Sequence, residues 1–168
     1  ITIAFFLDGL SPGEANLQSE VGEWIEGAID QAQKELTKNL SVQIKLDITD
    51  IKPATKAIPD EIKKQTRRGQ TQGPKTVKFI KNTYEETLNP DIICVVITHP
   101  IYLPGLRDLT GYSRFRTLCQ EMVPMLLTYD WDTMDDAPKA GILLSKLVTS
   151  SIDYVQWRST YPREDYFI

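Results

Sequence analysis

Apolar residues fill both faces of two short segments, Ile1–Leu7 and Asp91–Thr98. This composition is typical of central strands in a sheet that is covered on both sides, so we expect Ile1–Leu7 and Ile92–Thr98 to be adjacent, buried, parallel strands. Val123–Thr128 predicts a further strand. Val42–Ile48 alternates between apolar and polar residues instead, which indicates a strand nearer the sheet edge with one face in water.

Between these segments the apolar residues recur every three or four positions, which is the spacing of an amphipathic helix. From Glu14 to Lys38 the recurring residues are Leu17, Val21, Trp24, Ile25, Ala28, Ile29, Ala32 and Leu36. The same spacing predicts a second helix over Thr76–Leu88 and a shorter one over Ser113–Glu121. A further helix or irregular segment is expected near Gly141–Thr149.

The alternation of strands and helices predicts an α/β fold with a doubly wound, mostly parallel sheet and helices on both faces. Right-handed crossovers favour the order 2-1-3-4 for the four strands. Tyr154–Arg158 is a candidate fifth strand. The stretch 63–75 has no apolar residue apart from the Pro74 ring and predicts a flexible loop. The whole chain, residues 1–168, is expected to form a single α/β lobe.

Composition and charge narrow the choice of partners. The 168 residues carry a net charge of −4 with a pI near 5.1, and they lack the basic stripe of a nucleic-acid-binding surface. The one basic cluster, from Lys63 to Arg68, is interpreted as a solvated loop. No apolar run approaches the roughly 20 residues of a membrane span. We therefore expect no nucleic-acid partner, and contact with a membrane only through a continuation of the chain.

Most catalytic signatures are missing from the sequence. It has no glycine-rich dinucleotide fingerprint, no Walker loop and no nucleophile elbow, so no cofactor is expected. The single histidine, His99, excludes any metal site built from two histidines. At the end of a strand, His99 can serve as a general base, as a ligand contact or as part of a turn with Pro100. The acidic loop of Asp130, Asp132, Asp135 and Asp136 fits either a Mg²⁺ site or a solvated loop.

Five residues follow predicted parallel strands and should therefore lie along one rim of the sheet. They are Asp8, Thr98, His99, Tyr129 and Asp130. In open α/β sheets ligands bind beyond the carboxyl ends of the strands, so these residues are the predicted ligand-binding site. Tyr129 and its neighbour Trp131 fit either stacking on a ligand or plugging the top of the sheet.

Several stretches, taken in order, resemble the first lobe of the amino-terminal domain of NMDA-type ionotropic glutamate receptors. Asp47–Pro53 resembles a segment ending in Lys-Pro, and Ile93–Pro100 resembles a strand ending in Val-Ser-His-Pro. Gly111 to Thr128 resembles Gly-Phe-Tyr-Arg-Ile-Pro-Val-Leu-Gly-Leu-Thr, and Ser151–Pro162 resembles a strand followed by Leu-Arg-Thr-Val-Pro-Pro. Two departures are the absence of the family's helix cysteine from Thr76–Leu88 and a polar segment, 67–74, without a counterpart.

The resemblance implies one lobe of a type I periplasmic-binding-protein-like clamshell, with a second lobe and membrane spans after Ile168. It implies an extracellular, non-enzymatic domain of a glutamate-gated ion channel that acts in subunit assembly and allosteric tuning of gating. Its partners would be other receptor subunits and a small-molecule modulator. Trp24, Tyr112 and Phe115 would then form a dimer interface, and Asn39, in the sequon Asn39-Leu40-Ser41, would carry sugar.

Two other functions stay open on the residues alone. One is a small-ligand sensor lobe of another receptor of the clamshell class. The other is a small doubly wound enzyme in which His99 and Asp130 act as base and acid.

Overall fold

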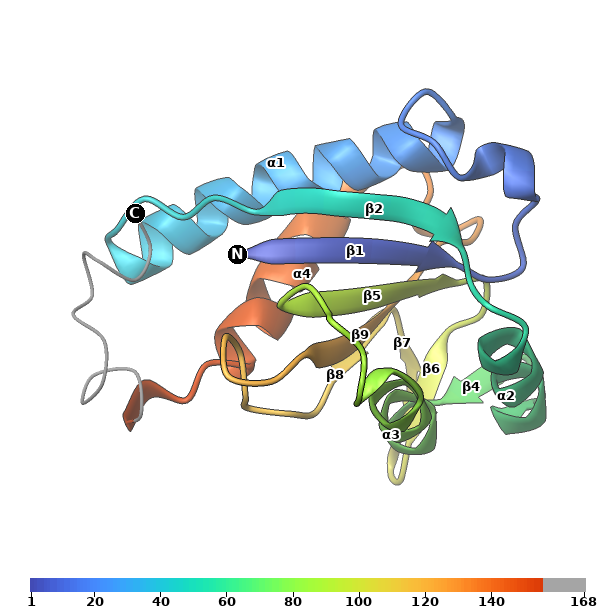
Figure 1. The fold of residues 1–168 in the computed structure, drawn as a ribbon. Helices are drawn as coiled ribbons and strands as arrows, with labels where there is room; N and C mark the ends of the chain where they lie inside the picture. The colour runs from blue at the N-terminus through green and yellow to red at the C-terminus, as the bar shows by residue number, and fades with distance from the viewer. Residues whose placement is uncertain (156–168) are drawn as a thin grey trace.

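The computed structural model describes residues 1–155 and has a mixed, five-stranded main sheet in the order β2-β1-β5-β9-β8 (Figure 1). Its strands are β1 (Thr2–Leu7), β2 (Asp47–Pro53), β5 (Ile92–Ile97), β8 (Gly111–Ser113) and β9 (Val123–Thr128). The β2, β1, β5 and β9 strands are parallel, and β8 is antiparallel to β9 at one edge. The α/β class and the order 2-1-3-4 of the four parallel strands agree with the sequence prediction.

The two most apolar strands, β1 and β5, are adjacent and parallel, as predicted, with Ile3 opposite Ile92 and Leu7 opposite Val96. The second strand was predicted at Val42–Ile48 but lies at Asp47–Pro53. Ile44 and Leu46 are buried as the alternation required, yet their backbone N–H groups donate to side-chain oxygens of the neighbouring helix rather than to a strand. Side-chain acceptors therefore replace the sheet ladder along this segment.

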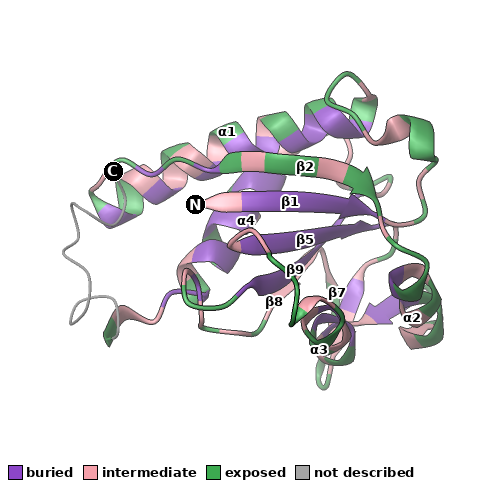
Figure 2. Cartoon of the chain, in the orientation of Figure 1, coloured by how far each residue is buried: buried purple, intermediate pink, exposed green. Residues whose placement is uncertain are grey.

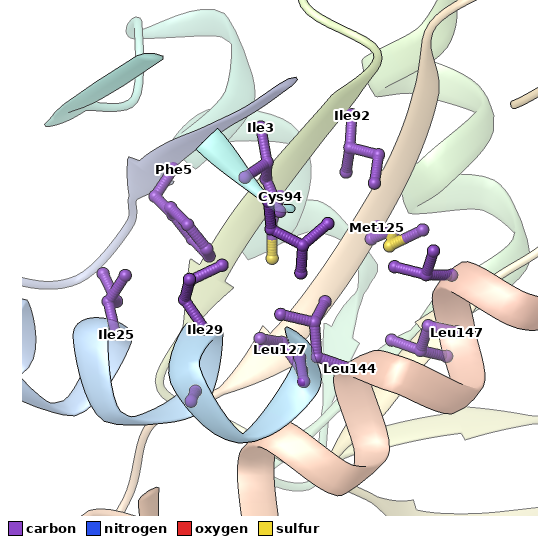
Figure 3. Packing of buried hydrophobic residues seen from close by; sticks show 14 of the residues in the cluster. Ile3, Phe5, Ile25, Ile29, Ile92, Cys94, Met125, Leu127, Leu144 and Leu147 are labelled. Carbon is purple, nitrogen blue, oxygen red and sulfur yellow. The ribbon is translucent and has the colours of Figure 1, made fainter. Parts of the chain in front are cut away.

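One face of the sheet is covered by two helices, α1 (Glu20–Leu40) and α4 (Ala137–Ser150), which also pack against each other. The α4 helix confirms the prediction near Gly141–Thr149 and begins earlier. In Figure 3, Ile25 and Ile29 of α1 and Leu144 of α4 point toward Phe5, Cys94 and Leu127 of the sheet. The helices and this face of the sheet thus share one apolar core.

The first helix starts later than its apolar spacing suggested. Pro12–Glu14 forms a single 3-10 turn, and Leu17, which is 38% exposed, precedes the helix. The Ser19 side chain accepts a hydrogen bond from the backbone N–H of Gly22 at 3.0 Å and so caps α1 at its N-terminus. The helix therefore begins after the capping Ser19, a boundary that the spacing of apolar residues alone did not predict.

The opposite face is covered by α2 (Ala57–Gln65) and α3 (Gly73–Tyr84). Ile58, Ile62, Val77 and Ile80 pack there against β1, β5 and β9 in a second apolar cluster. Figure 2 shows that the central strands β1 and β5 are buried, whereas the edge strand β2 is largely exposed. Helices therefore lie on both faces, as predicted.

The expected loop over 63–75 is instead regular structure. It contains the end of α2, a hairpin of β3 (Thr66–Arg67) and β4 (Gln70–Gln72), and the start of α3. Both turn residues of the hairpin have positive φ, 53° at Arg68 and 74° at Gly69, which is the backbone of a tight two-residue turn. The polar composition concealed these elements because the side chains that β4 buries, Gln70 and Thr71, are polar and give no apolar signal.

A second, four-stranded sheet in the order β3-β4-β6-β7 lies beyond the end of β5. It is completed by β6 (Ile101–Leu103) and β7 (Leu106–Leu109), which form an antiparallel hairpin. The β4 and β6 strands pair in parallel, with Thr71 opposite Ile101.

No helix covers Ser113–Glu121, because Ser113 belongs to β8 and pairs with Met125, after which turns lead to β9. Cys119, in this turn region, has φ of 68°, which a helix does not allow. The candidate strand Tyr154–Arg158 falls largely outside the described residues.

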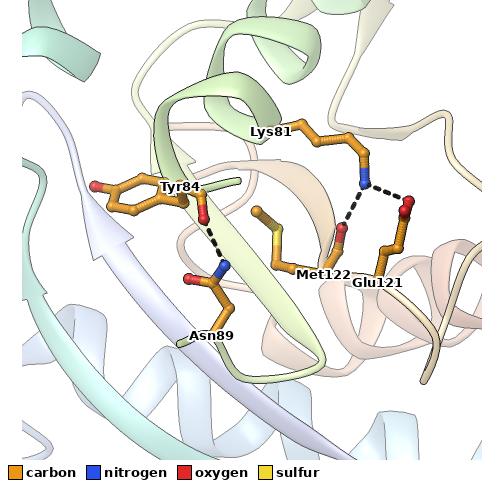
Figure 4. A network of polar contacts seen from close by, with 5 residues as sticks. All are labelled: Lys81, Tyr84, Asn89, Glu121 and Met122. Carbon is orange, nitrogen blue, oxygen red and sulfur yellow. Dashed lines mark hydrogen bonds and ion pairs between the residues drawn. The ribbon is translucent and has the colours of Figure 1, made fainter. Parts of the chain in front are cut away.

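Polar contacts fasten the end of α3 to the start of β9 (Figure 4). The Lys81 ammonium donates to the Glu121 carboxylate and to the Met122 carbonyl, both at 3.2 Å. The Asn89 side-chain amide donates to the carbonyl of Tyr84, the last residue of α3, at 2.6 Å and so ties the segment after the helix to its end. The amino ends of β5 and β9 are thereby held in place, and with them the register that aligns their carboxyl ends.

Candidate functional site

The carboxyl ends of β1, β5 and β9 meet at one edge of the main sheet, which we call the carboxyl edge and which carries Asp8, Thr98, His99, Tyr129 and Asp130. The hydrogen-bond ladder continues one residue past the strands. The Asp8 backbone N–H donates to the Val96 carbonyl at 2.9 Å, and that of Tyr129 donates to the Ile97 carbonyl at 2.8 Å. The five sequence-predicted residues therefore lie along one edge, and their role in ligand binding stays a prediction.

The Asp8 carboxyl lies within electrostatic reach of His99 at this edge, although no ion pair or hydrogen bond joins the two side chains. Burial raises the pKa of the Asp8 carboxyl above its ordinary value of 3.8, and the neighbouring His99 charge partly offsets this by lowering it. Asp8 is half-buried, whereas His99 is exposed. The pair thus combines a partly desolvated carboxyl with a solvent-accessible imidazole.

The turn after β1 brings Asp8 close to β5. Gly9 has φ of 76°, and a Cβ added at this position would lie 3.1 Å from Oγ1 of Thr98. Only glycine fits such a backbone at such close approach without strain. The side chain of Thr98 therefore packs directly against the backbone of Gly9.

Tyr129 plugs the top of the sheet. It is 7% exposed, and its ring meets the Trp24 ring edge to face with 5.0 Å between the centroids. Burial and the carboxylates of Glu20, Glu14 and Asp135 raise the pKa of the Tyr129 phenol. Trp24 itself is 4% exposed and packs in the core at the sheet face, which is one of its two predicted positions, and a role in a dimer interface stays a prediction.

Asp130 organises its own loop. One of its carboxylate oxygens accepts hydrogen bonds from the backbone N–H groups of Asp132 and Thr133, at 3.0 and 3.1 Å. Asp136, further along the acidic loop, caps α4 by accepting from the Lys139 backbone N–H at 3.0 Å. Within residues 1–155, no group of three or more His, Cys, Asp or Glu side chains is arranged to hold a metal ion.

A cavity of about 260 Å³ lies beside the carboxyl edge, between β9, the loop after it and α4. Leu127, Ala140 and Leu143 give it an apolar wall, and Lys139 and Lys146 line it from α4. Thr128 also lines it, and the Thr128 hydroxyl donates to the His99 carbonyl at 2.9 Å, so the cavity and the His99 turn share a residue. No sequence pattern pointed to this cavity, because it depends on how α4 packs beside β9.

The two other predicted interface residues serve the second apolar cluster. Tyr112 packs against the first residue of α3, where a Cβ added to Gly73 would lie 2.9 Å from its ring. The Lys81 ammonium lies 4.9 Å from the centroid of the Phe115 ring. Neither side chain is fully exposed. Asn39 is exposed in the last turn of α1, and its glycosylation stays a prediction.

Comparison with known proteins does not support a receptor domain. No protein-family model and no curated protein matches the chain. Among solved structures, it is similar to the crystal structure of an archaemetzincin from Methanopyrus kandleri, with 14% sequence identity and a TM-score of 0.49 over 90% of this chain and 72% of that one. At this level the likeness assigns no activity to the chain.

The resemblance to the NMDA-type receptor domain is therefore wrong, and with it the predicted role in channel assembly and gating. The prediction of a non-enzymatic domain rested on that resemblance, so it is corrected together with it. None of the described helices combines the length and apolar composition needed to cross a membrane. An extracellular location and a subunit partner stay predictions.

Proposed function

We propose that the chain is a small α/β enzyme that uses Asp8 and His99 as an acid–base pair at the carboxyl edge. The observation that carries the proposal is their placement after adjacent parallel strands, with the carboxyl partly desolvated and under the influence of the imidazole charge. Ligands in open α/β sheets bind beyond this end of the strands.

Each partner contributes a separate property. His99 is exposed and can take a proton from a substrate or return one, and imidazole is the side chain best suited to this near neutral pH. The raised pKa of the Asp8 carboxyl lies closer to neutral pH, where an acid or base catalyst works best. As a carboxylate, it also stabilises the imidazolium that forms when His99 accepts a proton.

Asp8 replaces Asp130 as the acidic partner that the sequence suggested. The Asp130 carboxylate already accepts two backbone N–H groups of its own loop, whereas the Asp8 side chain has no hydrogen-bond partner among residues 1–155. The acidic loop therefore shapes the site, and Asp8 is free to act in it.

The cavity between β9 and α4 is proposed to hold the part of the substrate away from the reacting atoms, because Asp8 and His99 do not line it and only Thr128 joins it to the His99 turn. Its apolar wall would hold a nonpolar substrate body, and its two lysines would attract an anionic or carbonyl-bearing end. The clamshell interpretation is not part of this proposal, because it depended on the receptor resemblance.

A panel of chromogenic esters, amides and phosphoesters tests the proposal. The wild type should turn over at least one class, and His99→Gln and Asp8→Asn should each reduce kcat/KM at least tenfold, within the usual effect of losing one acid–base group. Asp30→Asn, an exposed carboxylate on α1, is the matched control and should retain full activity. Full activity in both edge variants would contradict the assignment.

A further inference from the structure

Two hairpins from separate parts of the chain gather three arginines around one cavity. The β3–β4 hairpin contributes Arg67 and Arg68, and the β6–β7 hairpin contributes Arg107. The cavity measures about 540 Å³ and is also lined by Tyr102 and Leu106. Its size falls in the range of small-molecule sites.

The two hairpins are locked to each other by a reciprocal side-chain contact. The Gln70 amide donates to the Asp108 carboxylate at 2.6 Å, and the Asp108 backbone N–H donates back to the Gln70 side-chain oxygen at 3.0 Å. Gln70 is buried, and the next residues along continue the contact as the parallel β4–β6 pair. The backbones that carry the arginines are therefore fixed relative to one another before any ligand arrives.

The charges around this cavity are not balanced. Arg67 and Arg68 form no ion pair with a described residue. Arg107 lies 3.7 Å from the Asp108 carboxylate, but both side chains are well exposed, so this contact neutralises little. Around this cavity three positively charged guanidinium groups are thus offset by a single carboxylate, although the net charge of the chain is −4.

We propose that this cavity binds a small phosphate monoester that has an apolar or aromatic body. Guanidinium groups present planar pairs of N–H donors that match phosphate oxygens, and clustered arginines are a recurrent means of phosphate recognition. Tyr102 and Leu106, which is 57% exposed, give the ligand body an apolar surface next to the arginines. This site is separate from the carboxyl edge and does not depend on the acid–base proposal.

Phenyl phosphate, inorganic phosphate and phenol are suitable probes, with binding followed by amide chemical shifts in the full chain. Phenyl phosphate should bind more tightly than either of the others and should shift resonances of the two hairpins. Arg67→Ala and Arg107→Ala should each weaken its binding about tenfold or more, since a hydrogen bond to a charged group is involved. Arg107→Lys, which keeps the charge and loses the planar donor pair, should give an intermediate loss.

Two controls make the test decisive. Lys34→Ala removes an exposed cation from α1 and should leave binding unchanged. Gln70→Ala keeps all three arginines but removes the contact between the hairpins, and it should weaken binding. The proposal is overturned if phenyl phosphate does not shift the hairpins, if inorganic phosphate binds equally well, or if Lys34→Ala weakens binding as much as Arg107→Ala.

Discussion

Trp24 and Tyr129 meet edge to face at the carboxyl edge, with 5.0 Å between the ring centroids and 69° between the ring planes. The Trp24 indole N–H also donates to the Thr133 carbonyl at 3.0 Å. One side chain of α1 thus contacts both the residue that follows β9 and the loop after it. The position of this loop sets one wall of the cavity between β9 and α4, which Asp132 and Thr133 line.

Replacing Trp24 by alanine should lower the free energy of unfolding by about 3–5 kcal/mol, because it empties a buried aromatic site. Trp24→Phe should cost less, since it keeps a ring and loses the hydrogen bond. Urea denaturation measures both. Trp131→Ala is the control: Trp131 is 88% exposed, and its loss should change stability by less than about 0.5 kcal/mol. Equal effects at the two tryptophans would contradict the packing described.

The crossing of α1 and α4 makes a second test. A Cβ added at Gly141 would lie 2.5 Å from the Ala28 carbonyl oxygen, so Gly141→Ala must push the helices apart. We expect a loss of about 1–3 kcal/mol in unfolding free energy, typical of overpacking. Gly13→Ala meets no atom within 4 Å and should be close to neutral in the same assay. If Gly141→Ala is as stable as Gly13→Ala, the helices do not approach this closely.

The raised pKa of Asp8 makes stability depend on pH in a defined direction. Because its pKa in the folded protein lies above 3.8, the folded state binds this proton more readily than the unfolded state. The carboxylate therefore destabilises the fold at neutral pH, and the penalty disappears as pH falls through the folded-state pKa toward 3.8. Asp8→Asn should accordingly raise Tm at pH 7 and have little effect near pH 3.

Thermal unfolding of wild type and Asp8→Asn across this range measures the effect, with Asp30→Asn as the exposed control. A gain in Tm that is the same at pH 3 and pH 7 would show that the carboxyl charge is not its cause. A stabilising substitution at a proposed catalytic carboxyl would also fit the common conflict between stability and activity at such sites.

Two-sided apolar runs made the central strands readable from sequence. The apolar residues on both faces of Ile1–Leu7 and Ile92–Thr98 are typical of strands in the middle of a covered sheet. Right-handed crossovers then predicted that the two strands are adjacent. The strand predicted at Val42–Ile48 was misplaced. Its alternating apolar residues are buried as a strand requires, but its backbone donates to side chains of α1 instead of pairing with a strand. Alternation reports which side chains are buried and not what the backbone bonds to.

The candidate sites were less readable, because they depend on contacts between distant segments. The sequence placed Asp8 and His99 at one edge but paired His99 with Asp130, whose carboxylate is occupied by its own loop. The basic cluster from Lys63 to Arg68 was interpreted as a solvated loop, because the sequence does not show that Arg107 lines the same cavity as Arg67 and Arg68. The receptor resemblance failed because its matches were short, separate strand and turn segments, which unrelated α/β sheets can share.

The pKa of the Asp8 carboxyl, measured by carbon-detected NMR in wild type and in His99→Gln, tests the acid–base pair most directly. The missing Asp8→Asn resonance assigns the signal, and Lys34→Gln controls for loss of a distant cation. The pair predicts that His99→Gln raises the Asp8 pKa above its wild-type value, because the histidine charge that lowers it is gone, while Lys34→Gln leaves it unchanged. An Asp8 pKa that is equal or lower in His99→Gln would contradict the account.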